Sequence, residues 1–265
     1  MDKKDFYQDW QASEPEDWEW TLAEEEPVPD KGMGCWGKIL IIVLILGFVA
    51  LSFPEWRLLF SDQLELLSDT QHLNEDEIVQ KARPAVVSIE SKIWEGPLIN
   101  TRQGTGFNIS PQGKIVTNKH VLEEAEQIKV SFEDGRVFYP KEFVIFENVD
   151  MAYIKLNSSD LPFIEVDEER KPKKGDMVTI IGNPLGLRQV SQRGHVGGYH
   201  WTSGNKVPVF DIDVPANPGN SGSPVLNSQA QAVGIVFASG KVEIKGQMED
   251  RALAIPLREV LNQAE

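Results

Sequence analysis

The segment ANPGNSGSPVL, residues 216–226, has the composition of a turn that could hold a nucleophile. A serine hydroxyl that attacks a carbonyl must project from a tight turn, with backbone N–H groups converging beside it. Gly219 permits such a turn because it has no Cβ, and it leaves its own N–H accessible. We take Ser221 as a candidate nucleophile, and the N–H groups of Gly219 and Ser221 as a candidate oxyanion hole. A plain turn between two strands would have the same composition, so this segment alone does not decide the matter.

A serine nucleophile needs a general base, and the base needs a carboxylate that orients it. All four histidines precede Ser221, which excludes the Ser…Asp…His order of the α/β-hydrolases and leaves the order His…Asp…Ser. His120, in KIVTNKHVL, is predicted to end a strand, and Asp150, in NVDMAYIKL, is predicted to open one. Taken separately, His120 and Asp150 could each equally be an ordinary loop residue. Together, in this order and these contexts, they predict a catalytic triad of His120, Asp150 and Ser221.

The elements that must position these residues are short β-type runs separated by turn signals. Two series of runs, divided by the charged stretch 167–176, predict an all-β fold of two antiparallel barrels or a sandwich. EDG at 133–135 is a hairpin signal. We expect barrel one over about 84–166 and barrel two over about 172–256. The runs are 85–91, 104–109, 114–118, 127–132, 136–139, 142–146 and 151–156, then 176–182, 190–196, 207–213, 223–226 and 232–238.

Two helices are expected at the ends of this β-rich region. Residues 54–83 are predicted to be a linker and a lead-in helix, because Asn74 and Glu77 have capping-box spacing and Pro84 ends a helix at Arg83. The segment LREVLNQ, residues 257–263, is typical of a short amphipathic helix.

The N-terminal region has a different composition. Residues 1–35 contain 11 acidic residues and 3 lysines and show no apolar periodicity, so we expect a disordered acidic tail, although its aromatic residues would also suit a docking motif. Residues 36–53 enclose an unbroken apolar run and would span about 27 Å as a helix. A cleaved signal peptide would need a short basic leader. A single membrane anchor with the N-terminus in the cytoplasm fits better.

Composition excludes several classes of protein. The net charge of −15 argues against a nucleic-acid binder held by phosphate contacts. One cysteine excludes an internal disulfide and any cysteine-based zinc or iron–sulfur site, and the spacing of the histidines does not favour a metal site. We expect neither a metal nor a cofactor.

Five segments, in this order, resemble the trypsin-like protease domain of the HtrA/Deg serine proteases. They are GTGFNISPQGKIVTNKHVL, DMAYIKL, IIGNPLGL, DIDVPANPGNSGSPVL and ALAIPL. The resemblance implies a chymotrypsin-like fold over about 84–265, with the site in the cleft between two barrels. It implies an extracytoplasmic endopeptidase that cleaves unfolded or damaged proteins, held in a bacterial cell membrane through lipid contacts of residues 36–53. It leaves a homo-oligomer open. His120, Asp150 and Ser221 match the family's triad positions.

The sequence departs from the family at three places. Most members continue into PDZ domains, whereas this sequence ends at Glu265, which leaves PDZ-borne peptide sensing open. Ser223 stands where a second glycine is usual. Phe237 stands where a hydroxyl residue usually supports the catalytic aspartate, which predicts weaker support for Asp150 and leaves a low-activity enzyme open.

The candidate substrate pocket has no charge at its base. Trypsin-like enzymes that select Lys or Arg carry a carboxylate six residues before the nucleophile, and the nearest acids here, Asp211 and Asp213, fall in the preceding strand. Burying an aliphatic side chain contributes about 0.8 kcal/mol per CH₂, whereas an unpaired cation is costly to desolvate. We expect cleavage after small or medium apolar residues. The predicted lining is Pro215, Ala216, Ile235, Val236 and Phe237.

Two alternatives remain at this point. One is a catalytically silent peptide-binding scaffold, against which the complete triad argues. The other is a glutamyl endopeptidase, a class that shares the run GNSGSPV but places a histidine in the pocket wall, where this chain has GIVFA at 234–238.

Overall fold

A computed structural model of the 265-residue chain describes residues 35–52, 73–96, 98–183, 189–244 and 246–258. The chain forms two compact units, residues 1–56 and 57–265. In the first unit the predicted apolar run is helical, as helix α1 (Cys35–Ser52). Among the residues whose side chains are described, no helix is long and apolar enough to cross a membrane. The predicted acidic tail and most of the predicted helix at 257–263 lie outside the described residues.

The predicted lead-in helix is present, but its capping residue differs from the expected one. Helix α3 (Glu77–Ala82) has Asp76 as its N-cap, and this carboxylate accepts hydrogen bonds from the N–H groups two and three residues further on. The capping box from Asn74 was therefore wrong, since Asp76 directly precedes the first helical residue. Asn74 Oδ1 instead accepts a hydrogen bond from Arg83 Nη2 at 2.7 Å. A 3₁₀ turn, η1 (Arg83–Ala85), ends the helix at the proline, as predicted.

The first half of the β-rich unit is a seven-stranded antiparallel sheet in the order β5-β4-β1-β2-β3-β7-β6. The turn at 133–135 joins β4 to β5, as the EDG signal predicted. The strands are β1 (Val86–Glu95), β2 (Leu98–Asn108), β3 (Lys114–Thr117), β4 (Gln127–Ser131), β5 (Val137–Phe138), β6 (Phe143–Ile145) and β7 (Ala152–Lys155).

This sheet is not the closed barrel that the sequence predicted. Within the described residues no ladder joins its two edge strands, β5 and β6, which have only two and three residues. Pro140 lies between them and has no N–H to donate to a ladder. The sheet therefore remains a half-barrel.

The second half is a closed antiparallel barrel in the order β10-β13-β12-β11-β8-β9, as predicted. Buried aliphatic side chains and Phe210 fill its interior. The strands are β8 (Met177–Gly182), β9 (Val190–His200), β10 (Val209–Ile212), β11 (Pro224–Leu226), β12 (Ala232–Ile244) and β13 (Gln247–Pro256).

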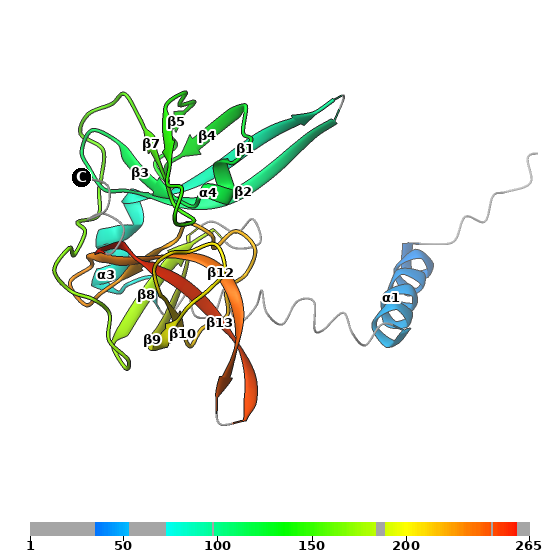
Figure 1. The fold of residues 1–265 in the computed structure, drawn as a ribbon. Coiled ribbons are helices and arrows are strands. Elements are labelled where there is room, and N and C mark those ends of the chain that lie inside the picture. The colour runs from blue at the N-terminus through cyan, green and yellow to red at the C-terminus, as the bar shows by residue number, and fades with distance from the viewer. Residues whose placement is uncertain (1–34, 53–72, 97, 184–188, 245, 259–265) are drawn as a thin grey trace, which may run out of the picture. The chain divides into compact units, whose positions relative to one another are not determined.

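The largest buried cluster joins the two halves. It combines side chains from the half-barrel, from the closed barrel and from α3, so the lead-in helix packs over the junction (Figure 1). Because this shared core fixes one half against the other, loops from both can build a common site. Its members include Val79, Ala82, Phe107, Val116, Ile181, Leu226 and Ile235.

Two long hairpins, β1–β2 and β12–β13, project from the body of the unit (Figure 1). Their inner halves are buried, whereas the outer half of β2 and the first residues of β13 are exposed. The sequence predicted only the inner parts, and it predicted no strand for β13.

Candidate active site

His120 and Asp150 meet because the strands that precede and follow them are paired. β3 runs antiparallel to β7, with Thr117 opposite Ala152, so the end of one and the start of the other lie at the same sheet edge. His120 lies not on β3, as predicted, but on the short helix α4 (Lys119–Leu122) that follows it. Its Nδ1 lies 2.6 Å from Asp150 Oδ2, and its backbone N–H donates to Asp150 Oδ1 at 3.0 Å.

One carboxylate thus holds both the ring and the backbone of His120. With Nδ1–H directed at Asp150, the imidazole presents Nε2 as a proton acceptor. The His120 side chain is 44% exposed and that of Asp150 is 22% exposed. A substrate can therefore reach the His120 ring, while the more buried Asp150 carboxylate holds that ring in place.

Two asparagines support Asp150, and sequence reasoning missed both roles. Asn118 Nδ2 donates to the Asp150 carbonyl at 2.8 Å, and the Asp150 N–H donates to Asn205 Oδ1 at 2.9 Å. Both asparagines are buried. Asn205 comes from the loop between β9 and β10, 55 residues along the chain, so only the tertiary structure reveals its contact.

Ser221 lies in the turn before β11, and two glycines of that turn have the positive φ that few other residues adopt. Gly219 has φ +98° and Gly222 has φ +90°. A Cβ on Gly222 would lie 1.8 Å from the Thr105 carbonyl oxygen, so this position accepts only glycine. The turn packs directly on β2.

The carbonyl groups of this turn are paired, and two of its N–H groups are not. The carbonyls of Gly219, Asn220 and Ser221 accept hydrogen bonds from the Thr105 hydroxyl, the Ser223 N–H and the Thr105 N–H, at 2.7, 2.9 and 2.8 Å. Within the part of the chain that the structure describes, the N–H groups of Gly219 and Ser221 donate to no acceptor. Two unpaired donors at these positions are what the predicted oxyanion hole requires.

Gly104 connects the two parts of the predicted triad. A Cβ on Gly104 would lie 2.8 Å from a methyl carbon of Val121, the residue after His120, and 3.4 Å from the Ser221 carbonyl oxygen. The absence of a side chain at this position therefore lets the His120 helix and the Ser221 turn approach each other. The structure brings His120 and Asp150 into contact, and it places both the helix of His120 and the turn of Ser221 beside Gly104.

Comparisons with known proteins identify the family of this chain. Residues 104–235 match the family model described as a trypsin-like peptidase domain. The chain is 32% identical over 168 residues to a putative serine protease, HhoB, of Synechocystis, covering 61% of this chain and 39% of that protein. It is also 32% identical over 189 residues to the serine endoprotease DegS of Salmonella typhimurium, covering 68% of this chain and 53% of the relative.

A solved structure, of the HtrA-type protease AlgW with a tripeptide, is 25% identical and superposes with a TM-score of 0.60. That match covers 70% of this chain and 60% of the AlgW chain. The chain belongs to the HtrA-type serine proteases. It spans 39% and 53% of the lengths of the two curated relatives.

Ser223 fits at this position, where the family usually has a glycine, because residue 182 is itself a glycine. Ser223 is fully buried, and a Cβ on Gly182 would lie 2.2 Å from the Ser223 hydroxyl oxygen. The extra side chain beside the candidate nucleophile thus occupies space that β8 leaves free.

Phe237 stands at a bulge in β12 and packs, half-buried, against the cluster that includes Val149 and Met151, the neighbours of Asp150. It supplies no hydroxyl to the Asp150 carboxylate. Asn205 instead accepts a hydrogen bond from the backbone N–H of Asp150. Asp150 is therefore held through its backbone, and not by a hydroxyl group on its carboxylate as is usual in the family.

The predicted pocket residues lie on both sides of the nucleophile turn. The backbone of Val236 exchanges hydrogen bonds with Gly222 and Ser223 at 2.8 and 2.9 Å, which places β12 beside Ser221. The side chains of Ile235 and Val236 are buried in two different clusters. Pro215 is exposed, and Ala216 and Phe237 are partly buried, so these three are the members of the predicted lining that a substrate could reach.

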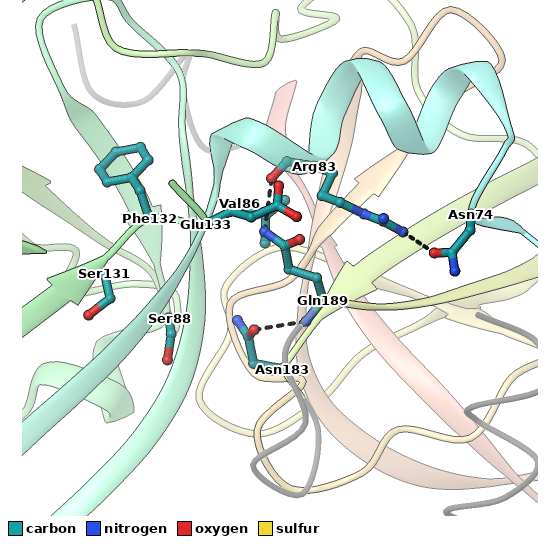
Figure 2. Close-up of a pocket in the computed structure, with 9 residues that line it drawn as sticks. All are labelled: Asn74, Arg83, Val86, Ser88, Ser131, Phe132, Glu133, Asn183 and Gln189. Carbon is teal, nitrogen blue, oxygen red and sulfur yellow. Dashed lines mark hydrogen bonds between the residues drawn. The ribbon is translucent and has the colours of Figure 1, made fainter. Parts of the chain in front are cut away.

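A groove lined mostly by polar residues lies at the junction of the two halves. Two adjoining hollows, of about 400 and 150 Å³, share Ser88, Ser131 and Asn183, and the smaller one reaches Gly104. Figure 2 shows the larger hollow, with Arg83 hydrogen-bonded to Asn74 at its far end. In the described part of the chain, no three His, Cys, Asp or Glu side chains gather into a metal-binding cluster.

Proposed function

We propose that this chain is a membrane-anchored serine endopeptidase that cleaves unfolded polypeptides through an acyl-enzyme. The strongest support for the proposal is the arrangement of the predicted catalytic groups. The His120–Asp150 pair, with its 2.6 Å contact, lies across Gly104 from a turn whose serine has two unpaired N–H groups beside it. Base, orienting carboxylate, nucleophile and oxyanion donors are the full set that acyl transfer needs.

In the proposed mechanism, the Ser221 hydroxyl oxygen attacks the carbonyl carbon of a peptide bond while His120 Nε2 takes the hydroxyl proton. Asp150 orients the ring and stabilises the imidazolium. The N–H groups of Gly219 and Ser221 bind the oxyanion. His120 then gives its proton to the leaving amine, and water attacks the acyl-enzyme with His120 again as base, which restores Ser221.

The proposed substrate is an extended, unfolded chain that presents an apolar residue to the pocket. The polar groove supports this class of substrate, since it lies along the junction, includes Gly104 in its lining, and has room for several residues of an extended segment. The pocket supports the apolar preference. Asp211 is buried and paired with Arg251 and His200, so its carboxylate is not available to a substrate cation.

Casein digestion by the full chain, beside the Ser221→Ala variant, tests the proposal. Casein should be degraded by the wild type and not by the variant. Fragment mapping by mass spectrometry should give most cuts after Val, Ala, Ile or Leu. A folded wild type that leaves casein intact would support the silent scaffold. A majority of cuts after Glu or Asp would support the glutamyl endopeptidase, and a majority after Lys or Arg would refute the pocket.

The anchor is the second part of the proposal. Residues 36–53 would hold the chain in the membrane, with residues 1–35 in the cytoplasm and the protease unit outside; a helical apolar run and a family with periplasmic members support this. Protease added to spheroplasts should digest the C-terminal unit and leave the tail intact. Release of the chain by a carbonate wash would contradict the anchor.

A further inference from the structure

We propose that Thr105 is the positioning residue of the oxyanion hole, and that its hydroxyl holds the nucleophile turn in the orientation that acyl transfer needs. The inference rests on the proposed function, since it gives a role in the same reaction to a residue outside the triad. Thr105 lies on β2 in the half-barrel and is fully buried.

Thr105 contacts the turn on both sides of the nucleophile's N–H. Its backbone N–H donates to the Ser221 carbonyl at 2.8 Å, and its hydroxyl donates to the Gly219 carbonyl at 2.7 Å. These two carbonyls flank the peptide unit that carries the Ser221 N–H. One residue therefore fixes the peptide units before and after an oxyanion donor.

The direction of the Thr105 hydroxyl is set by Asn183. The backbone N–H and the side-chain Nδ2 of Asn183 lie 3.0 and 3.3 Å from Thr105 Oγ1, and both are donors. A hydroxyl has a single proton, so with these donors on its lone pairs it must direct that proton at the Gly219 carbonyl. Asn183 is held in turn by the Val87 carbonyl and the Gln189 N–H.

The turn needs such an external contact because of its glycines. Gly219 can adopt many backbone conformations, and it has no side chain that could hold the peptide unit between Gly219 and Asn220. Thr105 binds the carbonyl of this unit, and the Asn217 carbonyl accepts its N–H at 3.0 Å. With both contacts in place, the N–H groups of Gly219 and Ser221 remain on the open side of the turn.

The hydroxyl can be removed with little change in volume by Thr105→Val and kept by Thr105→Ser. Thr179→Val is a matched control, because Thr179 is also buried on a strand and its hydroxyl accepts one hydrogen bond, from Arg193. All variants are made in the full chain. The measurements are kcat and KM on an apolar peptide substrate, inhibition by a peptide aldehyde ending in valinal, and Tm.

Loss of a direct oxyanion donor costs about 10²–10³ in kcat, so loss of a residue that positions the donors should cost about 10–100-fold. Thr105→Val should lower kcat by this factor with little change in KM, and should weaken aldehyde inhibition in parallel, because the bound aldehyde carries an oxyanion. Thr105→Ser should recover most of kcat, and Thr179→Val should lower Tm without lowering kcat.

If Thr105→Val does not fold, Thr105→Ala carries the same test, since it removes the hydroxyl without adding a methyl group beside Asn183. Unchanged kcat in these variants, with an active wild type, would overturn the inference alone. An equal fall of kcat in Thr179→Val at the same Tm would also overturn it. An inactive wild type would instead refute the proposed function.

Discussion

The pairs His120–Asp150 and His200–Asp211 look alike at first sight, since each has a ring nitrogen 2.6 Å from a carboxylate oxygen. Their surroundings differ. The Asp150 carboxylate is bonded only by His120 among the described residues. Asp211, on β10 in the closed barrel, also accepts hydrogen bonds from Arg251 Nη1 at 2.9 Å and from the Gly198 N–H at 2.7 Å.

The ring nitrogens in contact also differ. His120 uses Nδ1, which leaves Nε2 at the outer end of the ring, where a nucleophile can reach it. His200 uses Nε2, which leaves Nδ1 beside its own backbone. A short histidine–aspartate contact is therefore not enough for general-base catalysis, which also needs the outer nitrogen free and a nucleophile next to it.

The charge of Asp211 serves the fold. Its side chain is 1% exposed, and a Cβ on Gly197 would lie 2.0 Å from its Oδ2, so the barrel is built closely around it. Burial alone would raise the pKa of Asp211, but hydrogen bonds from His200, Arg251 and Gly198 outweigh burial and lower it below its usual 3.8. The group stays ionised and paired.

The largest expected difference between the pairs is in turnover. His120→Ala should lower kcat by about 10⁴-fold or more, because base and nucleophile act as a unit. His200→Ala should leave kcat within about threefold, because His200 touches no triad residue in the described structure. Peptide hydrolysis by the two purified variants measures both. A comparable fall in both would remove the distinction drawn here.

The aspartates should separate activity from stability. Asp150→Asn should lower kcat by about 10³–10⁴-fold with little change in Tm, since it disturbs the tautomer of His120. Asp211→Asn should destabilise the fold by about 3 kcal/mol, because Arg251 keeps a largely buried charge and loses one of its two carboxylate partners, the other being Glu249. Urea unfolding and kinetics on the same samples test this. The reverse pattern would show that the roles have been exchanged.

A smaller effect is expected from the support behind Asp150. Asn205→Ala should lower kcat by about tenfold, because the Asp150 N–H loses its acceptor and the carboxylate its fixed position. Thr202→Val is the control, since it removes only the partner of the Asn205 amide. Equal kcat in Asn205→Ala and the wild type would assign Asn205 to packing alone.

The smallest effect is a dependence of stability on pH. Because the folded-state pKa of Asp211 is lowered, its stabilising contribution is present above the unfolded-state pKa near 3.8 and is lost as pH falls through the folded-state value. The Tm difference between the wild type and Asp211→Asn should therefore shrink below about pH 4. A difference that grows with acidification would mean that the pKa is raised instead.

Sequence reasoning could predict a triad because its residues lie in short motifs with a fixed order. The structure brings His120 and Asp150 together as those motifs require. Sequence reasoning could not identify the roles of Thr105 and Asn205, because their contacts leave no local pattern in the sequence. Each acts through a partner that is more than 50 residues away, and only tertiary packing brings the partners together.

The fold was predictable to a similar extent. Alternating apolar runs identified the inner strands, where one face is buried. The outer parts of the β1–β2 and β12–β13 hairpins have no buried face and so carry little signal. The open edge between β5 and β6 depends on strands of two and three residues, which are too short for periodicity to define.

The central claim is that Ser221 is a nucleophile activated by His120, and active-site labelling tests it most directly. The full-length wild type, His120→Ala, His200→Ala and Ser221→Ala are treated with a fluorophosphonate at pH 8, and the labelled peptide is identified by mass spectrometry. The wild type and His200→Ala should be labelled at Ser221 at equal rates, His120→Ala far more slowly, and Ser221→Ala not at all. A folded wild type without label, or with label on another residue, would contradict the claim.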